Sequence, residues 1–159
     1  MDTQEYERLA NKYLDSIYRV AVNGCQNYAD AEDVVQNTFV KLWERKETFD
    51  DEDYARKWLI KVAVNECHSL WRSGWKRRIS YLEELDVEPV FSTPEKSNLY
   101  DALQSLPPKY RQIVYLFYYE GYSVKEIATM MKLSETAVKS RLLRARKQLK
   151  SYLKEAWDE

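Results

Sequence analysis

The residues with the clearest chemistry lie in a basic run near the C-terminal end of the chain. Six basic residues and no acidic residue occur between Lys139 and Lys150. Lysine and arginine side chains neutralise phosphates, whereas polar side chains near a helix start can reach base edges. The alternative is an ordinary helical hairpin with a solvated basic face. The absence of any compensating acid favours nucleic-acid binding.

The elements that must position this run are two short helices joined by a tight turn, over residues 121–150. Ser123 is a good N-cap, and Glu126 completes a capping box three residues later. Ser134 follows the turn and caps the second helix. That helix has an apolar stripe at helical spacing, formed by Val138, Leu142, Ala145 and Leu149. Its opposite side carries Ser140, Leu143, Arg144 and Lys147, and Lys139 lies beside that side. This is the pattern of a helix-turn-helix, whose second helix fits a DNA major groove about 12 Å wide.

Two further helices are predicted before this hairpin. The first begins near Ser97 and is broken at Pro107-Pro108, because proline is acceptable only in the first turn of the next helix. The second covers the aromatic-rich residues 110–119 and ends at Gly121. Its predicted core face is Ile113, Val114, Phe117 and Tyr118.

The first half of the chain predicts three longer helices. One runs from Asp2 to Gly24, and a second is capped by Asp30 with acids in its first turn, where the helix dipole favours them. The third covers residues 54–72. Its predicted inward face is Trp58, Leu59, Val62, Ala63 and Leu70. Phe49 lies in the acidic stretch before it.

Composition excludes several classes of protein. The 159 residues include three glycines and four prolines, and no alternating strand pattern occurs. We therefore expect an all-α chain of two small helical domains, residues 1–76 and 97–159, joined by an acidic linker over 77–96. No apolar run is long enough for a membrane span, and no signal peptide is evident. The absence of a disulfide framework fits a reducing cytoplasm. Cys25 and Cys67 are isolated and are expected to be buried thiols.

No catalytic or cofactor-binding constellation is evident in the sequence. The single histidine adjoins Cys67, and two neighbouring residues do not make a zinc site. No glycine-rich phosphate loop or nucleophile constellation is present. We expect no enzyme activity, no metal and no cofactor.

Both halves of the chain resemble bacterial sigma factors of the small extracytoplasmic-function group. ADAEDVVQNTFVKLWE resembles the region-two helix that docks on RNA polymerase, and FDDEDYARKWLIKVAVNECHSLWR resembles the part that melts and reads the −10 element. ALQSLPPKYRQIVYLFYYEGYSVKEIATMMKLSETAVKSRLLRARKQL resembles region four, which reads the −35 element. Two matched blocks in order across a linker are more specific than a helix-turn-helix alone. The resemblance implies core RNA polymerase and promoter DNA as partners, together with an anti-sigma factor.

The resemblance also implies roles for individual residues. The polymerase-binding positions are Asp30, Glu32, Asp33, Gln36 and Phe39. The −10 positions are Phe49, Lys61 and Asn65, and the −35 positions are Lys139, Ser140, Leu143 and Arg144. An exposed aromatic suits stacking with an unpaired base. Two alternatives stay open, because Phe39 can belong to the core and Phe49 can fold back onto Trp58.

One departure from the family pattern concerns the turn. Lys132 occupies the turn position usually filled by glycine, so a left-handed backbone there would cost roughly 1–2 kcal/mol. Two other functions remain possible on the residues alone. A helix-turn-helix regulator would bind DNA without joining the polymerase, and a small recombinase or nuclease would need catalytic carboxylates that are not evident.

Overall fold

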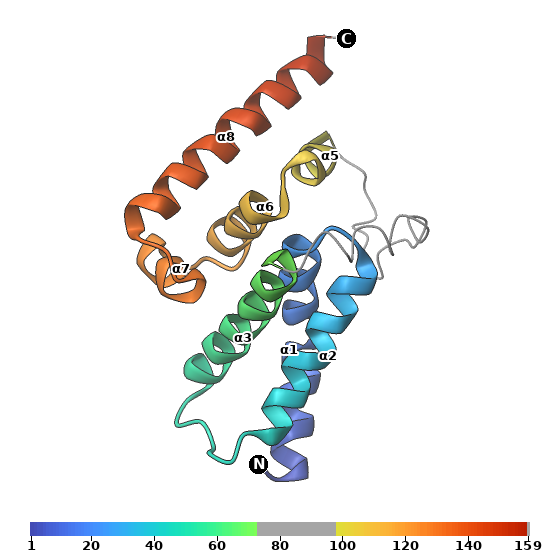
Figure 1. Cartoon of the computed structure of the whole chain (residues 1–159), viewed down its shortest axis with the longest axis vertical. Coiled ribbons are helices and arrows are strands. Elements are labelled where there is room, and N and C mark those ends of the chain that lie inside the picture. The colour runs from blue at the N-terminus through green and yellow to red at the C-terminus, as the bar shows by residue number, and fades with distance from the viewer. Residues whose placement is uncertain (73–97, 159) are drawn as a thin grey trace. The chain divides into compact units, whose positions relative to one another are not determined.

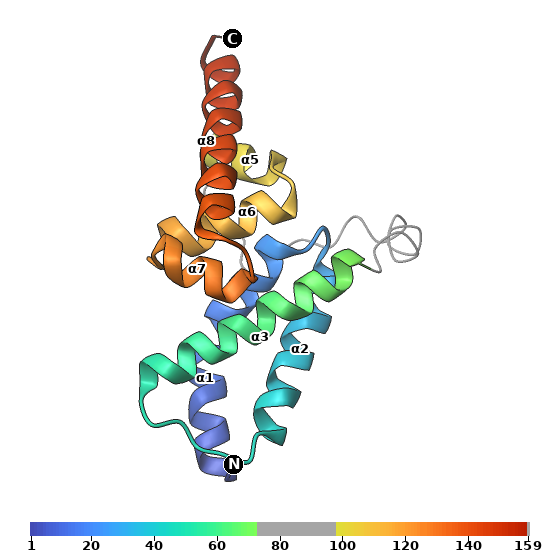
Figure 2. The ribbon, with the colours of Figure 1, turned by 60° about the vertical axis from the view of Figure 1, so that its left-hand side comes forward.

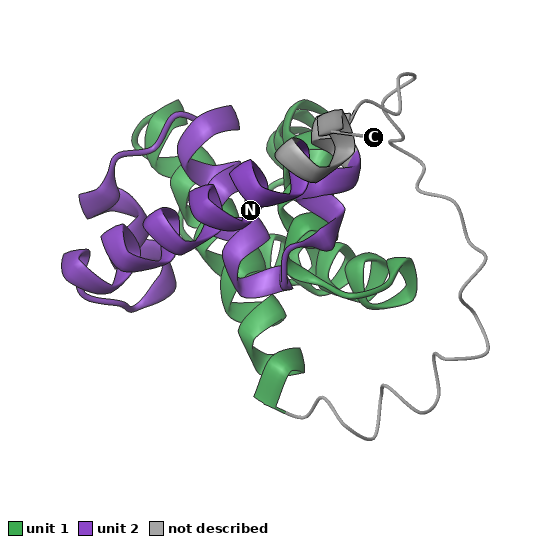
Figure 3. Ribbon diagram, turned by 90° about the horizontal axis from the view of Figure 1, so that it is seen from above, with its two compact units in different colours: residues 1–88 green, residues 89–159 purple. Residues whose placement is uncertain are grey.

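The computed structural model describes residues 1–72 and 98–158, and these residues fold entirely into helices and their connections (Figure 1). The chain divides into two compact units, Met1–Glu88 and Pro89–Glu159 (Figure 3). The all-α prediction is confirmed. The predicted linker over residues 77–96, like the expected start of the second domain at residue 97, lies outside the described residues.

Three helices make up the described part of the first unit: α1 (Thr3–Gly24), α2 (Tyr28–Glu44) and α3 (Glu52–Arg72). Asp2 caps α1, because its carboxylate accepts a hydrogen bond from the Glu5 amide at 2.8 Å. Each helix packs against the other two. The core consists mainly of aliphatic side chains at helical spacing: Leu9, Ile17, Val20, Val34, Leu42, Leu59, Ile60 and Val64.

Two local predictions in this unit are wrong. The N-cap of α2 is Asn27, whose side-chain oxygen accepts from the Asp30 amide at 2.8 Å, so Asp30 lies inside the first turn. In α3 the buried residues are Ala55, Leu59, Ile60, Ala63, Val64 and Cys67. Trp58, Val62 and Leu70 are only half-buried, because they flank the buried stripe of α3 and do not lie on it.

The second unit contains α5 (Asn98–Ser105), α6 (Pro108–Val114), α7 (Val124–Met131) and the long α8 (Glu135–Asp158). Pro108 opens α6 as predicted. Helices α5, α6 and α7 all pack against α8, and α5 and α6 lie beside it in two views (Figures 1 and 2). A small cluster of Leu106, Val114 and Ala145 anchors this packing, with Leu103, Tyr110 and Leu149 at its margin.

A π-helical turn, η1 (Tyr115–Tyr119), continues α6 and changes which side chains face the core. The Glu120 amide donates to the Tyr115 carbonyl at 3.1 Å, a bond one residue longer than in an α-helix. The wider turn shifts the register. Tyr115 and Leu116 are buried, whereas Tyr118, predicted to be in the core, is 56% exposed.

A helix in the described part of the chain would need about 20 consecutive, mostly apolar residues to span a membrane. None of the helices in that part is both long enough and apolar enough to cross a bilayer.

Candidate nucleic-acid interface

Helix α8 presents two opposite faces that follow directly from its sequence. Ser134 caps it by accepting a hydrogen bond from the Ala137 amide at 3.1 Å. Val138, Leu142 and Ala145 are buried against the rest of the unit. The four predicted −35 residues are all exposed on the other side: Lys139, Ser140, Leu143 and Arg144. Leu143, a large apolar residue, is 52% exposed, so this face is not explained by packing within the unit.

The turn before α8 fixes the helix by backbone geometry. Ser123 and Glu126 form the predicted capping box at the start of α7, with bonds of 3.1 and 3.0 Å. Lys132 adopts a left-handed conformation, φ 56° and ψ 45°. The next amide, of Leu133, donates back to the Ala128 carbonyl at 2.9 Å. This hydrogen-bonded turn ends α7 and fixes the backbone that leads into α8.

Two arginines of α8 are held by tyrosines from the preceding segment. The Arg146 Nε donates to the Tyr118 hydroxyl at 2.5 Å, and its guanidinium also lies near the Tyr118 ring. A hydrogen bond with Arg144, together with nearby positive charges, lowers the pKa of Tyr110. Sequence reasoning missed both contacts. Tyr118 reaches Arg146 only because the π-helical turn exposes it, and residue spacing does not reveal such a turn.

In the first unit, the connection between α2 and α3 ends in an aromatic cluster formed by Phe49, Tyr54 and Trp58 under Arg45. The Phe49 ring lies 5.5 Å from Trp58 and 5.6 Å from Tyr54. The Arg45 guanidinium lies 4.2 Å from the Phe49 ring centre. The structure thus shows the alternative in which Phe49 folds back onto Trp58. Tyr54, which the sequence analysis did not select, is the exposed ring of the cluster at 52%.

Lys61 and Asn65 lie one turn apart on α3, so they share one side of the helix. Lys61 is exposed and Asn65 is half-buried. Tyr54 is two turns before Lys61 and lies on the same side. The structure therefore groups an exposed aromatic ring with a cation and an amide along α3.

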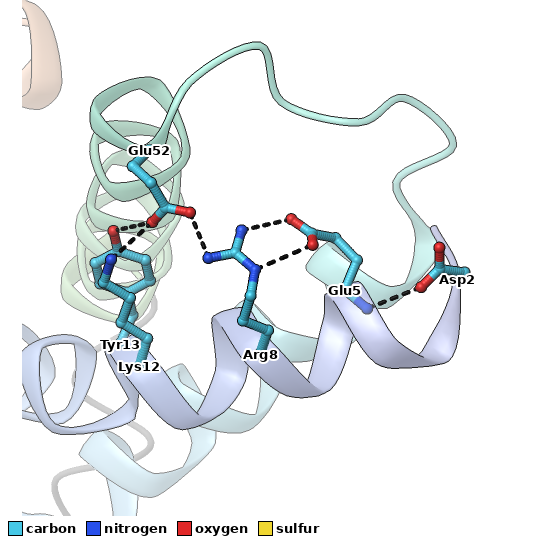
Figure 4. A network of polar contacts seen from close by, with 6 residues as sticks. All are labelled: Asp2, Glu5, Arg8, Lys12, Tyr13 and Glu52. Carbon is cyan, nitrogen blue, oxygen red and sulfur yellow. Dashed lines mark hydrogen bonds and ion pairs between the residues drawn. The ribbon is translucent and has the colours of Figure 1, made fainter.

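A polar network holds the start of α3 against α1 (Figure 4). Glu52 accepts hydrogen bonds from Tyr13 at 2.7 Å and Lys12 at 3.1 Å, and it pairs with Arg8. These bonds, led by that of Tyr13, lower the pKa of Glu52 to about 2. Burial and the Glu52 carboxylate raise the pKa of Tyr13 to about 12. The network fixes the C-terminal side of the connection that carries Phe49.

The five predicted polymerase-binding residues of α2 divide into exposed and buried positions. Glu32 and Gln36 are exposed and Asp33 is half-buried. Asp30 and Phe39 are 9% and 7% exposed, so the alternative in which Phe39 belongs to the core is the one observed. Asp30 and Phe39 therefore lie beneath the exposed residues of α2 and are not part of its outer surface.

Sequence reasoning missed two apolar residues on the same side of α2. Val40 and Trp43 are 46% and 50% exposed, although both are large and apolar. They follow Gln36 by four and seven residues, which places all three on one face. That spacing was the signal available in the sequence. The exposed face of α2 thus begins acidic and ends apolar.

Comparisons with known proteins cover both units. A family model for sigma-70 region 2 matches residues 9–77, and one for sigma-70 region 4 matches residues 96–149. The chain is 33% identical over 155 residues to the ECF RNA polymerase sigma factor SigL of Mycobacterium tuberculosis, covering 92% of this chain and 88% of SigL. It is 29% identical to the RNA polymerase sigma-E factor of Streptomyces coelicolor, covering 94% and 86% of the two chains.

The fold also matches solved structures. Sigma factor RpoE of Bartonella quintana, crystallised with the anti-sigma factor NepR, superimposes with a TM-score of 0.72 at 24% identity, covering 96% of this chain and 98% of RpoE. The matches span both units in order, which a helix-turn-helix regulator or a recombinase would not explain. The chain belongs to the sigma-70 family, in its extracytoplasmic-function group of non-enzymatic RNA polymerase sigma factors that bind core polymerase and promoter DNA at transcription initiation.

Proposed function

We propose that α8 reads the −35 element of the promoter with Lys139, Ser140, Leu143 and Arg144. The observation that carries this proposal is their common exposure on a capped helix whose opposite stripe is buried. The side chains nearest the start of the helix reach base edges, and Arg144 adds a fork of donors suited to guanine. Arg146 follows Arg144 by two residues, so it points to another side of α8 and contacts only the flanking phosphates.

The −10 element is read and opened by the first unit, through Phe49, Lys61 and Asn65. An unpaired base stacks on the aromatic cluster, where Tyr54 offers the accessible ring and Phe49 and Trp58 the layer beneath it. Lys61 contacts the backbone of the separated strand, and the Asn65 amide hydrogen-bonds a base edge. The polar network around Glu52 supports this assignment, since it keeps the cluster in place before DNA arrives.

Core polymerase docks on α2 through Asp30, Glu32, Asp33, Gln36 and Phe39. Glu32, Asp33 and Gln36 form the outer contact, and Asp30 and Phe39 set the shape of the helix surface. Val40 and Trp43 extend the contact with apolar area. A surface that is acidic at one end and apolar at the other suits a basic, amphipathic helical partner.

The domain plan that goes with these roles is residues 1–76 for docking and the −10 element, 77–96 as a connector, and 97–159 for the −35 element. The protein works in the cytoplasm, where its polymerase is. An anti-sigma factor is its regulatory partner, as NepR is for RpoE of Bartonella quintana, whose fold this chain shares.

The test of −35 reading compares two arginines of the same helix. Holoenzyme carrying Arg144→Ala or Arg146→Ala is bound to a panel of −35 variants at several salt concentrations. Arg144→Ala should cost about 1–3 kcal/mol on the preferred promoter and flatten discrimination at one position. Arg146→Ala should weaken all promoters alike and reduce the salt slope by about one. An unchanged ranking with Arg144→Ala would show that α8 does not lie in the groove as proposed.

A further inference from the structure

Two cysteines that are distant in the sequence meet in the core of the first unit. Cys25 directly follows α1, and Cys67 lies in α3, 42 positions later. Their sulfur atoms are 3.8 Å apart. Cys25 is 4% exposed and Cys67 is fully buried, and both are reduced. The expectation of buried thiols is confirmed, but the two residues are not isolated from each other.

The backbones on either side of this cysteine pair are held in place. The Trp71 indole Nε1 donates to the Gly24 carbonyl at 2.7 Å, which ties the end of α1 to the last turn of α3. The His68 ring packs on Trp71 with centroids 4.4 Å apart. A disulfide has an S–S length of about 2.05 Å, so the sulfur atoms must approach by about 1.8 Å. Side-chain rotation can supply much of this approach, since Cys25 has an extended backbone outside the helix.

The surroundings favour chemistry between two thiols over metal binding. Within residues 1–72 and 98–158, no three histidine, cysteine or acidic side chains are grouped so that they could hold a metal ion. A structural zinc site needs four ligands. Two adjacent thiols can undergo oxidation without any further ligand, and the second thiol then resolves the product of the first.

We propose that Cys25 and Cys67 form a reversible intramolecular disulfide when the protein meets a peroxide. The sulfur of Cys25, the more accessible of the two, attacks one oxygen of hydrogen peroxide, the O–O bond breaks, and water leaves. The product is a sulfenic acid on Cys25. The Cys67 sulfur then attacks the Cys25 sulfur and displaces the hydroxyl, which leaves as a second water with the Cys67 proton. Two thiols and one peroxide thus give one disulfide and two waters, and a dithiol reductant reverses the change.

The disulfide encloses all of α2 and the aromatic cluster within one covalent loop. Closing such a loop restricts the unfolded chain more than the folded one. The oxidised protein should therefore melt at least about 10 °C higher than the reduced protein. A peroxide signal would in this way stabilise the polymerase-docking and −10 unit without adding a contact to its surface.

The test is chemical and uses the full chain. The reduced protein is treated with hydrogen peroxide, remaining thiols are alkylated, and peptides are analysed by mass spectrometry with parallel melting curves. We expect a monomer with one peptide pair joined through Cys25 and Cys67, lost on treatment with dithiothreitol, and the higher melting temperature. Thiols that stay alkylatable at peroxide levels that oxidise glutathione would overturn the proposal, as would dimers or sulfinic acids in place of the internal bond.

Single-cysteine variants separate the two steps. Cys67→Ser should leave Cys25 as a sulfenic acid that dimedone traps, with no peroxide-induced rise in melting temperature. Cys25→Ser should give little dimedone adduct, because Cys67 is fully buried. Equal trapping at both positions would contradict the order of attack. The wild-type peptide pair still decides the proposal if either variant folds poorly.

Discussion

At the scale of single residues, two arginines of α8 are held in place by tyrosine hydroxyls. Tyr118 accepts from Arg146, and Tyr110 is hydrogen-bonded with Arg144. A long side chain that is already oriented loses less rotamer entropy when it binds. The side chains of Arg144 and Arg146 are therefore partly oriented before they contact DNA.

Tyr118→Phe removes the hydroxyl that accepts from Arg146 while keeping the ring near the guanidinium. We expect holoenzyme binding to weaken about two- to fivefold on all promoters alike, since one oriented phosphate contact contributes about 0.5–1 kcal/mol when a side chain is immobilised. Tyr119→Phe is the matched control, because Tyr119 is also exposed but its ring stacks on Tyr115. Fluorescence anisotropy with labelled promoter fragments measures both. Equal effects of the two variants would argue against positioning by Tyr118.

The lowered pKa of Glu52 predicts that the stability of the first unit depends on pH. Its pKa falls from an ordinary value of 4.5 to about 2 in the folded protein. A lowered folded-state pKa stabilises the protein above pH 4.5, and this contribution is lost as the pH falls through 2. Because Glu52 is partly solvent-exposed, screening limits its contribution to about 1 kcal/mol.

The measurement for Glu52 is urea unfolding of wild type and Glu52→Gln between pH 2 and 7. The variant should be less stable at pH 7, and the difference should vanish near pH 2. Glu47→Gln, an exposed change on the same connection, should show no such convergence. If the difference in stability between wild type and Glu52→Gln stays constant from pH 2 to 7, the ionised Glu52 carboxylate does not stabilise the first unit.

At the scale of elements, much of the fold could be predicted because helix caps and apolar spacing are local signals. The capping box at Ser123 and Glu126 and the break at Pro107-Pro108 are examples. The predictions that failed depend on longer-range or competing effects. Asn27 and Asp30 are both good caps, and only the packed helix selects between them. The π-helical turn and the meeting of Cys25 with Cys67 depend on tertiary packing, which residue spacing does not encode.

The candidate interfaces could be predicted to a similar extent. The exposed face of α8 follows from its buried stripe, so Lys139, Ser140, Leu143 and Arg144 were accessible to sequence reasoning. Tyr54 could not be selected from the sequence, because it becomes the outermost ring of the aromatic cluster only when Phe49 folds back.

The backbone of the turn between α7 and α8 is strained, and this strain can be tested by substitution. Lys132 has a positive φ of 56°, which a residue with a Cβ adopts at a cost. Lys132→Gly should raise the free energy of unfolding by about 1 kcal/mol, since relief of the strain exceeds the added freedom of the unfolded chain. Gln148→Gly, within α8, should lower it by about 0.5–1 kcal/mol. Thermal and urea unfolding give the free energy of unfolding of each variant. If Lys132→Gly destabilises the protein as Gln148→Gly does, the backbone of Lys132 is not strained.

At the scale of the whole molecule, the proposed function divides promoter recognition between two units, one for duplex DNA and one for unpaired DNA. The chain is nearly neutral, with 25 basic and 26 acidic residues, so binding depends on where its charges lie. In the proposed function, the basic face of α8 contacts duplex DNA, whereas the aromatic cluster requires a separated strand. Substitutions in the two units should therefore affect different steps of initiation.

Phe49→Ala and Asn65→Ala should each impair promoter opening by about tenfold while leaving closed-complex affinity within about twofold. Phe49→Ala removes the layer that supports the stacking ring, and Asn65→Ala removes a base-edge hydrogen bond, and each loss costs about 1–3 kcal/mol. Permanganate reactivity of unpaired thymines reports opening, and gel shifts at low temperature report closed binding. Arg144→Ala, the matched change in the other unit, should weaken closed binding instead. Normal permanganate reactivity in both Phe49→Ala and Asn65→Ala would show that these two residues do not read the −10 element.

Trp58 gives the aromatic cluster a built-in optical reporter. Its indole lies 5.5 Å from Phe49 and 5.1 Å from the Arg45 guanidinium, so its emission is sensitive to whatever enters or leaves that cluster. With the other tryptophans replaced by phenylalanine, Trp58 would follow strand capture in real time without an added dye. The same residue that supports Phe49 would then give the rate of DNA melting as a fluorescence trace.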